Sequence, residues 1–274
     1  MQIKTFQIAQ NKNISLDIQA ASLDGMTAQL PQGFYTTFST LAQGTRVLGL
    51  KSHLERLYGP SNELGLHPPV NEAELRRQIA ILVKENLPHE SRVRLILTKD
   101  KGELYIGIQS FEPLPETVYT KGVKVISTET ARQDPRIKDT GFISSSAEQR
   151  KLLSKDVFEI LLTKDGKILE GMTSNFYAIK GKTVVTAQRG ILLGVTRKAV
   201  LRIARGQGMS IEYRSPKLNE RFDEGFLTSS SRGVVPIISI DGKPIGQGSV
   251  GKWSKILSKA YQAYVMERSE LIAR

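Results

Sequence analysis

The stretch ILEGMTSNFYAI, residues 168–179, says more about the fold than any other part of the chain. It reads as the end of one strand and the start of another around a short turn, because apolar residues stand on both sides of a polar centre. Glu170 ends the first strand, and Asn175 opens the second. A carboxylate next to glycine is most often a surface turn residue, so its meaning depends on the segments that accompany it.

A lysine lies 32 residues before this carboxylate (170 − 138 = 32), in the loop RIKDTGFISSS at 136–146. The chain holds 39 Lys and Arg residues, so Lys138 taken alone has no special standing. A lysine amine becomes a nucleophile toward carbonyl compounds when its surroundings keep it neutral. Lys138 is therefore a candidate catalytic amine only if other segments support that chemistry.

Three further segments are suited to binding an anion. In GILLGVTRKAV, residues 190–200, Val195 and Thr196 stand where a helix begins, and a helix N-terminus presents free N–H groups and the positive end of its dipole. A hydroxyl-rich turn at 228–231 follows a strand. Arg56, in the helical pattern LKSHLERL, can hold a phosphate through two N–H groups. Each feature, alone, is more often an ordinary cap, turn or solvated face.

The composition is that of an ordinary globular protein, with 39% hydrophobic and 24% charged residues among 274. The absence of Cys excludes a disulfide framework, thiolate catalysis and Cys-ligated metals, and it agrees with a reducing cytoplasm, where we expect the protein. No apolar run approaches the roughly 18 residues of a membrane span, and the first residues do not read as a signal peptide. Three histidines without HxxxH spacing predict no metal site.

The net charge of +12 raises the question of nucleic-acid binding. The basic residues are spread along the chain, without a run of five or six and without the basic and aromatic interleaving of single-strand binders. We therefore expect no nucleic-acid partner. The charge is interpreted as a basic surface that also attracts small anions such as phosphates and carboxylates.

The predicted elements alternate between strands and helices. Strands fill the first 40 residues, two helices follow, and two more strands surround the turn KDKG. Pro60 is expected to break or restart the first helix, whereas Asn71 caps the second with Glu74 as its capping-box partner. A further helix is predicted over about 146 to 155, and the chain closes with a long amphipathic helix from about Gly251.

This order of elements indicates a two-domain α/β (α+β) protein. The segment FEPLPETVYTKG has two prolines and little apolar content, and it reads as a linker. The predicted N-terminal domain spans residues 1–112, the linker 113–122 and the C-terminal domain 123–274.

Taken together, the segments resemble the class IV, or fold-type IV, pyridoxal-phosphate enzymes: branched-chain aminotransferases, D-amino-acid aminotransferases and aminodeoxychorismate lyases. The resemblance starts at GFYTTFST, continues through LxxHLERL and covers most of residues 33–250. The residues that match its sharpest motif, EGxxxNxF, are Glu170, Gly171, Asn175 and Phe176. The residues that match the following motif, TA…LxGxTR, are Thr186, Ala187, Leu192 or Leu193, Gly194, Thr196 and Arg197.

The resemblance implies a small N-terminal α/β domain, a larger C-terminal pseudo-barrel domain and the cofactor pyridoxal 5'-phosphate. Lys138 would be the Schiff-base lysine that also moves the proton of the substrate Cα, and Glu170 would face the pyridine nitrogen and keep the ring protonated. The residues implied to hold the cofactor are Lys138, Glu170, Arg56, Val195, Thr196, Ser229, Ser230 and Asn175. Those implied to lie near the substrate are Tyr35, Thr37 and Ser231.

Departures from the family pattern leave the substrate open. After the lysine the chain reads Asp139-Thr140-Gly141-Phe142 where relatives often carry Asn-Tyr or Asn-Leu, so the partner of the ring hydroxyl is also open. The Arg-x-His pair with which D-amino-acid aminotransferases bind the α-carboxylate is missing, and so is the RGxGGRGY run typical of the lyase.

The leading prediction is a pyridoxal-phosphate-dependent aminotransferase that moves an amino group from an amino acid or amine to a 2-keto acid in a ping-pong sequence. One alternative is a lyase of the aminodeoxychorismate type that releases pyruvate. A third hypothesis, from another class, is a non-catalytic binding protein of the same fold, which the joint retention of Lys138, Glu170 and the anion-binding segments opposes. The resemblance also predicts a homodimer.

Overall fold

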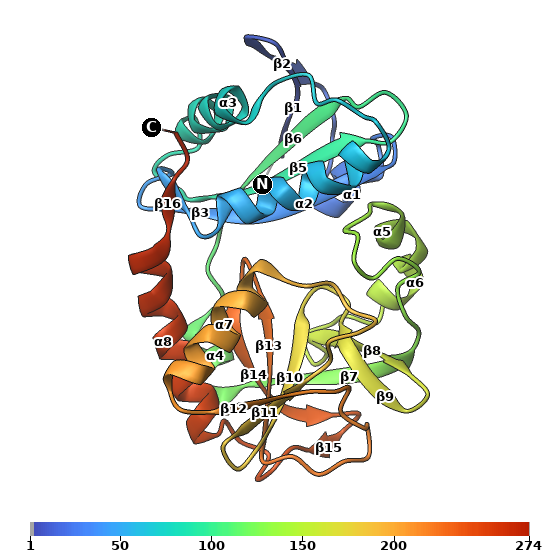
Figure 1. The fold of residues 1–274 in the computed structure, drawn as a ribbon, viewed down its shortest axis with the longest axis vertical. Helices are drawn as coiled ribbons and strands as arrows, with labels where there is room; N and C mark the ends of the chain where they lie inside the picture. The colour runs from blue at the N-terminus through green and yellow to red at the C-terminus, as the bar shows by residue number, and fades with distance from the viewer. Residues whose placement is uncertain (1–2, 274) are drawn as a thin grey trace. The chain divides into compact units, whose positions relative to one another are not determined.

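The computed structural model describes residues 3–273, which form two compact units (Figure 1). The first unit contains the chain up to Glu112, the segment Ile137–Ser146 and the residues from Arg268 onward. The second contains Pro113–Arg136 and Ala147–Glu267. The sequence-based division differs at two places, because it assigns both 137–146 and the C-terminal residues to the second domain.

Backbone hydrogen bonds explain both differences. The Tyr35 N–H donates to the carbonyl of Lys138 at 2.9 Å, so the segment around the lysine is joined to a strand of the first unit. At the C-terminus, strand β16 (Glu270–Leu271) pairs with strand β4 (Arg46–Val47), and Ile272 is buried in the core of the first unit. Linear order along the chain does not reveal such long-range pairing.

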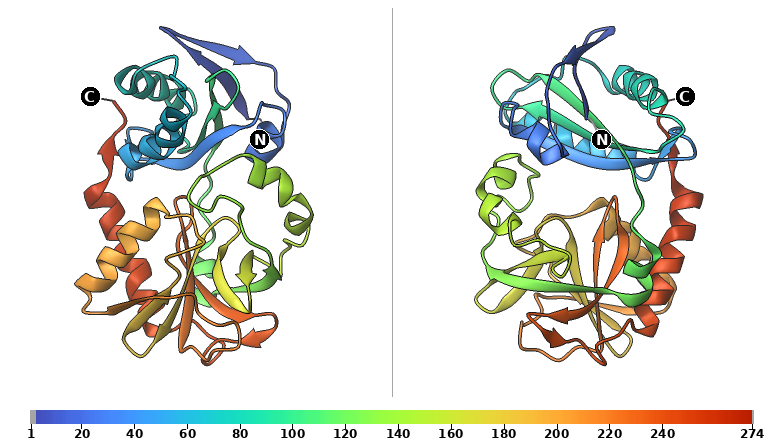
Figure 2. Two further views of the ribbon diagram at one scale, coloured as in Figure 1. Left: turned by 45° about the vertical axis from the view of Figure 1, so that its right-hand side comes forward. Right: turned by 180° about the vertical axis from the view of Figure 1, so that it is seen from behind.

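The first unit is built on a seven-stranded sheet in the order β16-β4-β3-β5-β6-β1-β2, and every neighbouring pair is antiparallel. The β1–β2 hairpin extends beyond the rest of this sheet (Figure 2). The other elements are β1 (Lys4–Ala9), β2 (Lys12–Leu16), α1 (Leu23–Thr27), β3 (Gly33–Leu41), α2 (Leu50–Glu63), α3 (Glu72–Lys84), β5 (Ser91–Thr98), β6 (Leu104–Ser110) and α5 (Gly141–Ser145).

Helix α2 packs on this sheet through one apolar face. Leu50, Leu54 and Leu57 recur at helical spacing, and each is fully buried in the core of the unit. Pro60 neither breaks nor restarts the helix, contrary to the prediction, since α2 continues to Glu63. The proline removes a single backbone N–H near the C-terminal end, and the packing of the leucine face outweighs that loss.

Helix α3 begins with half of the predicted capping box. The Asn71 side chain accepts a hydrogen bond from the Glu74 N–H at 2.9 Å, which confirms the cap. The Glu74 carboxylate does not complete the box. It accepts instead from Gln78 at 2.7 Å and binds the Arg77 guanidinium. Hydrogen-bonding and ion-pairing partners one turn along the helix therefore compete successfully for this carboxylate.

The second unit contains a nine-stranded mixed sheet in the order β12-β11-β10-β13-β14-β7-β8-β9, with β15 paired to β14. Its strands are β7 (Val123–Glu129), β8 (Glu159–Lys164), β9 (Lys167–Gly171), β10 (Asn175–Lys180), β11 (Thr183–Thr186), β12 (Ser210–Tyr213), β13 (Glu224–Ser229), β14 (Gly233–Ile240) and β15 (Lys243–Pro244). Its helices are α4 (Glu116–Lys121), α6 (Ala147–Arg150), α7 (Val195–Gly206) and α8 (Lys252–Arg268). Helices α7 and α8 lie side by side in Figures 1 and 2.

This sheet curls so strongly that strands far apart in its order come together. Strands β9 and β10 are consecutive in the chain and lie adjacent, although β13, β14, β7 and β8 separate them in the hydrogen-bonded order. The turn between them is closed by a hydrogen bond from the Gly171 N–H to the Ser174 carbonyl at 2.8 Å. The stretch 168–179 thus forms the predicted strand–turn–strand unit, with Glu170 near the end of one strand and Asn175 at the start of the next.

Two predicted elements differ in the second unit. The segment 113–122 is not an irregular linker throughout, because it contains helix α4, Glu116–Lys121. The helix predicted over 146 to 155 is reduced to the four residues of α6, followed by an irregular segment with exposed Leu152 and Leu153. Among residues 3–273, no helix combines the length and the apolar character that crossing a membrane requires.

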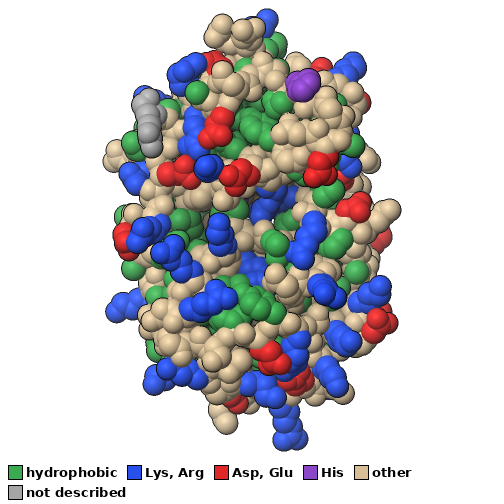
Figure 3. Space-filling model, viewed as in Figure 1, with side chains coloured by type: hydrophobic (Ala, Val, Ile, Leu, Met, Phe, Trp, Pro, Cys, Tyr) green, Lys and Arg blue, Asp and Glu red, His purple; other side chains and the backbone are tan. Residues whose placement is uncertain are grey.

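The charged side chains are interspersed on the surface. Lys and Arg side chains are spread over the whole visible face in Figure 3, with acidic and apolar side chains between them.

We expect the replacement Asn71→Ala to lower the free energy of unfolding by about 1 kcal/mol, because the Glu74 N–H loses its acceptor. Asn71→Asp keeps an acceptor at the same place and serves as the control. Urea denaturation of the three proteins measures the effect. Equal midpoints for Asn71→Ala and Asn71→Asp would show that the cap contributes nothing.

Candidate active site

Lys138 lies in an irregular segment that is attached to the beginning of strand β3. The carbonyl of Lys138 accepts from the Tyr35 N–H, and two residues later the Thr140 N–H donates to the Gly33 carbonyl at 2.9 Å. The Gly33 N–H in turn donates to the Thr140 hydroxyl at 2.9 Å. Hydrogen bonds on both sides of Asp139 therefore hold the backbone of the lysine segment in one place.

The Lys138 side chain lies against the predicted substrate residue Tyr35. Its Nζ atom is 4.6 Å from the centroid of the phenol ring, and the Arg94 guanidinium carbon is 4.9 Å from the same centroid. Both cations are attracted to the ring face. Tyr35 thus separates the predicted catalytic lysine from the buried guanidinium of Arg94.

Asp139, the residue after Lys138, is held by the side chain of Lys99. Lys99 forms an ion pair with the Asp139 carboxylate, which also accepts from the Gly141 N–H at 2.5 Å. The family pattern has an amide residue in this region, and the carboxylate here is bound within the first unit. Asp139 thus fixes the loop between Lys138 and α5.

His53 is buried, although an amphipathic helix would place it by default on a solvated face. Its exposed fraction is 1%, and its Nδ1 atom is 2.6 Å from the Thr36 hydroxyl. Burial, followed by the positive charges of Arg56 and Lys138, holds the pKa of His53 well below its ordinary value. The imidazole is therefore neutral at pH 7, and it stands near both of the predicted cationic site residues of the first unit.

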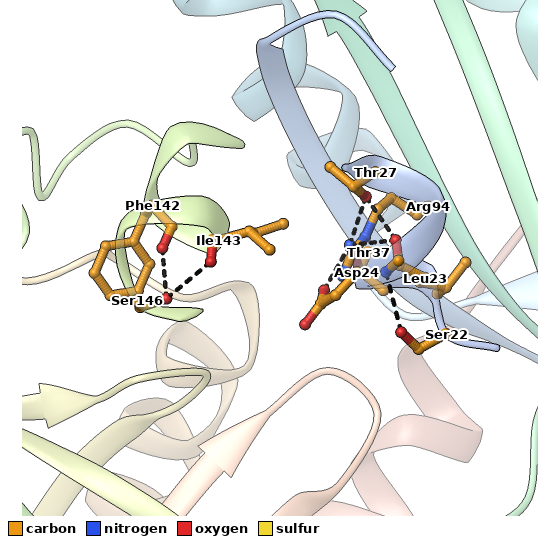
Figure 4. Close-up of polar contacts among 10 residues, drawn as sticks. Ser22, Leu23, Asp24, Thr27, Thr37, Arg94, Phe142, Ile143 and Ser146 are labelled. Carbon is orange, nitrogen blue, oxygen red and sulfur yellow. Dashed lines mark hydrogen bonds and ion pairs between the residues drawn. The ribbon is translucent and has the colours of Figure 1, made fainter. Parts of the chain in front are cut away.

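Thr37 belongs to a network around the buried side chain of Arg94 (Figure 4). The guanidinium donates to the Thr37 hydroxyl at 3.1 Å from Nε, and to the Asp24 carboxylate and the Thr27 hydroxyl at 2.8 Å each from Nη1. Thr37 and Arg94 are direct register partners of β3 and β5. This predicted substrate residue thus has a structural partner in the first unit.

In the second unit, Glu170 is 1% exposed and surrounded by donors. Its Oε1 atom accepts from Arg132 Nε at 2.8 Å, and its Oε2 atom accepts from the Leu192 N–H at 3.1 Å and from Asn175 Nδ2 at 3.3 Å. Hydrogen bonds from donors and an adjacent cation both favour the ionised form of a carboxylate. Glu170 is therefore held as an anion in the interior.

Asn175 also connects the strand that it opens to a second segment of the chain. The same amide nitrogen donates to the Leu192 carbonyl at 2.8 Å, so the side chain joins β10 to the loop that leads into α7. A Cβ atom on Gly194 would stand 2.4 Å from the Asn175 Oδ1 atom, which explains why this position in the loop carries glycine. The described contacts of Asn175 are thus directed at the protein around Glu170.

The N-terminus of α7 retains the features expected of an anion seat. Its N-cap is Gly194, and within residues 3–273 no side chain caps the helix. Val195 and Thr196 form its first turn, in which backbone N–H groups have no partner within the helix. Thr196 is buried, and its hydroxyl lies beside the Tyr261 phenol of α8.

The hydroxyl-rich turn is also anchored at both ends. Tyr177, fully buried and stacked on Phe226 with 4.5 Å between ring centroids, lies with its hydroxyl 3.0 Å from that of Thr228. At the other end, the Arg232 N–H donates to the Ser229 carbonyl at 3.3 Å. The two serines between are partly exposed. The turn thus presents hydroxyl and N–H groups from a fixed backbone.

The predicted site residues fall into two groups, one in each unit. Those of the first unit are Tyr35, Thr37, Arg56 and Lys138. Those of the second are Glu170, Asn175, Val195, Thr196, Ser229, Ser230 and Ser231.

Three residues around these groups were missed by sequence reasoning. Arg94 interrupts the apolar strand RVRLILT, and such an interruption is a signal that a buried charge has a partner. His53 lies on the same helix as Arg56 and three residues before it, which places the two on one face. Arg132 has no comparable signal, since it lies in an irregular segment among many other basic residues.

We expect Arg132→Met to lower the free energy of unfolding by about 3–5 kcal/mol, because it leaves the Glu170 carboxylate buried without its cation. The double replacement Arg132→Met with Glu170→Gln should recover most of that loss, since neither charge then remains. Urea denaturation measures both, with exposed Arg189→Met as the control. Additive effects of the two replacements would contradict the pairing.

The neutral state of His53 predicts a dependence of stability on pH. The unfolded chain binds a proton at His53 near pH 6.5 that the folded protein excludes, so the free energy of unfolding falls as the pH falls below about 6.5. One proton contributes a slope of up to about 1.4 kcal/mol per pH unit. His53→Asn should flatten the profile between pH 7 and 5, whereas exposed His89→Asn should not. An unchanged slope in His53→Asn would contradict the assignment.

Comparison with known proteins identifies the family of the chain. The family model described as amino-transferase class IV matches residues 33–240. A D-alanine aminotransferase of Bacillus licheniformis is 29% identical over 236 residues, which cover 80% of this chain and 83% of the relative. A putative branched-chain-amino-acid aminotransferase of Methanocaldococcus jannaschii is 24% identical over 235 residues, with 79% and 82% covered.

Solved structures share the fold. A putative branched-chain amino acid aminotransferase of Thermotoga maritima superposes with a TM-score of 0.81 at 22% identity, over 96% of both chains. A T.th. branched-chain amino acid aminotransferase with pyridoxamine 5'-phosphate has a TM-score of 0.82 at 20% identity, over 98% of this chain and 95% of that one. The expected fold-type IV architecture is thereby confirmed. Because the family model matches most of this chain, the chain belongs to the class IV aminotransferases.

Proposed function

We propose that this pyridoxal-phosphate-dependent aminotransferase uses Lys138 as its catalytic amine and Glu170 as the carboxylate that faces the ring nitrogen. The observation that carries the proposal is the burial of Glu170 as an anion among three donors. A buried charge with such support is costly to maintain for structure alone. It is well suited to hold a proton on a basic nitrogen.

The residues present fit the cofactor. The phosphate needs donors that are not already used, and the uncapped N-terminus of α7 and the turn at 228–231 offer backbone N–H and hydroxyl groups. Val195, Thr196, Ser229 and Ser230 are the proposed donors, with Arg56 as the cation. Gly194 brings no side chain of its own to the start of the helix, and within residues 3–273 no side chain caps it by a hydrogen bond.

When bound, the cofactor supplies a protonated ring that withdraws electrons from the substrate Cα. The Lys138 amine would take the proton from the substrate Cα and then deliver it to the cofactor. The amine must be neutral to accept this proton. The Tyr35 ring lies against this amine, and the buried His53, whose own pKa is lowered in part by the charge of Lys138, stands nearby. The attachment of the lysine segment to β3 keeps the amine in position between the two transfers.

Glu170 holds the proton of the ring nitrogen in this proposal. Arg132, the Leu192 N–H and Asn175 each donate to the carboxylate and limit its rotation. A carboxylate fixed in this way keeps its charge directed at one place, and no reorganisation is needed during the reaction. Arg132 is then a positioning residue that acts through Glu170.

The substrates are proposed to be an α-amino acid donor and a 2-keto acid acceptor. Relatives named as D-alanine aminotransferases and others named as branched-chain aminotransferases are both present among the matches. Tyr35, Thr37 and Ser231 are proposed to line the substrate side. We also propose a homodimer, the commonest symmetric assembly, and the cytoplasm as the compartment; sedimentation velocity tests the former.

Mixing the holoenzyme with single amino acids tests the function. Transamination predicts that at least one donor converts the cofactor to its pyridoxamine form, which absorbs at a shorter wavelength, and that a 2-keto acid reverses the change. The donor that reacts, a D- or an L-amino acid, identifies the stereochemistry. Release of pyruvate from aminodeoxychorismate without any such half-reaction would replace the proposal by the lyase.

We expect Lys138→Ala to reduce the rate of the half-reaction by about 10²- to 10⁴-fold, the range of effects typical of a proton-transferring side chain. Borohydride reduction followed by peptide mapping should place the cofactor on Lys138 in the wild type. Exposed Lys155→Ala is the control and should retain activity. Normal turnover by Lys138→Ala, or labelling of another lysine, would overturn the assignment.

A further inference from the structure

We propose that Arg232 is a positioning residue that fixes the hydroxyl-rich turn at 228–231 to the loop that follows Glu170. This proposal rests on the proposed function, which assigns that turn to the phosphate of the cofactor.

The first set of contacts joins Arg232 to the turn itself. Its backbone N–H closes the turn on the Ser229 carbonyl at 3.3 Å, and its side chain folds back so that Nε donates to the Ser229 hydroxyl oxygen at 3.0 Å. Its own carbonyl accepts from the Tyr119 hydroxyl at 2.9 Å. Arg232 thus determines where the Ser229 hydroxyl points, since the oxygen that accepts from Nε must donate its proton elsewhere.

The second set of contacts joins the same guanidinium to the loop between Glu170 and Asn175. Its Nη2 atom donates to the Glu159 carboxylate at 3.0 Å and is also hydrogen-bonded to the Thr173 hydroxyl. The guanidinium carbon lies 5.3 Å from the centroid of the Phe158 ring, so the plane of the side chain is supported as well. One rigid group therefore binds two segments that are more than fifty residues apart.

Glu159 explains why a cation is required at this place. The carboxylate is 1% exposed, and besides Arg232 it accepts from the Thr173 N–H at 3.3 Å, the Thr173 hydroxyl at 2.5 Å and the Ser174 hydroxyl at 3.1 Å. A Cβ atom on Gly171 would stand 2.2 Å from the Ser174 oxygen and 3.1 Å from Cγ of Glu159, so the loop is packed closely on the carboxylate. Glu159 organises the loop, and Arg232 supplies the opposite charge.

The consequence is a turn that is ordered before it binds an anion. A serine-rich turn free to move would lose conformational entropy on binding, whereas a turn held by Arg232 at one end and by Tyr177 at the other has lost it on folding. Lysine has no planar fork and cannot bridge Ser229 and Glu159 with the same geometry. The inference therefore predicts an effect specific to the anionic part of the ligand.

Binding of pyridoxal phosphate and of pyridoxal to the full-length apoprotein tests the inference, because the two ligands differ only in the phosphate. Arg232→Met should raise the dissociation constant of pyridoxal phosphate by about 10- to 100-fold, the range for loss of charge-assisted hydrogen bonds, and leave that of pyridoxal within about threefold. Arg232→Lys should give an intermediate value. Exposed Arg221→Met is the matched control and should match the wild type.

Each outcome bears on a distinct statement. Equal loss of both ligands in Arg232→Met, or no loss of either, overturns the positioning role of Arg232 and leaves the proposed function intact. A wild-type protein that does not prefer the phosphorylated ligand overturns the proposed phosphate seat instead. If Arg232→Met does not fold, the double variant with Glu159→Gln removes both charges of the pair, and it should fold and still show the reduced preference for phosphate.

Discussion

Arg132 and Glu170 form an ion pair in the interior of the second unit, where an unpaired charge is too costly to keep. The surrounding chain is arranged to supply the remaining hydrogen bonds of the carboxylate. The curled sheet brings β9 beside β10, so that Glu170 and Asn175 meet across a tight turn. The loop before α7 passes close enough for the Leu192 N–H to donate to the same oxygen. The position of the helix N-terminus therefore depends on contacts made by this carboxylate.

A second buried carboxylate repeats the arrangement eleven residues earlier in the chain (170 − 159 = 11). Glu159 is paired with Arg232 as Glu170 is paired with Arg132, and both glutamates hold the loop between β9 and β10. The two ion pairs serve different parts of one ligand in the proposed function. One fixes the partner of the ring nitrogen, and the other fixes the turn that holds the phosphate. Each arginine thus acts through the carboxylate with which it pairs.

The parts of the site that could be predicted from the sequence are those that depend on residues close together in the chain. The strand–turn–strand unit at 168–179 and the start of α7 follow from local patterns, and both are found where expected. The pairing of Arg132 with Glu170 spans 38 residues and joins an irregular segment to a strand, so no periodicity reveals it. The attachment of the Lys138 segment to the first unit was hidden for the same reason, because it consists of backbone hydrogen bonds to β3.

Other differences show tertiary packing overriding local rules. Pro60 remains inside α2 because the leucine face of the helix is buried. His53 is buried and neutral, since the Thr36 hydroxyl accompanies it into the core of the first unit. The helix predicted near residue 150 forms only the short α6. Leu152 and Leu153, which follow it, are exposed, so within the described residues no burial of these leucines stabilises a longer helix.

The protonation state of the ring nitrogen tests the account most directly. Pyridoxal phosphate labelled with ¹⁵N in the ring can be bound to the protein, and its ¹⁵N chemical shift distinguishes a protonated from an unprotonated nitrogen. The account predicts a protonated nitrogen in the wild type at neutral pH and above, and an unprotonated one in Glu170→Gln. An unprotonated nitrogen in the wild-type holoenzyme at pH 7 would contradict the central role assigned to Glu170.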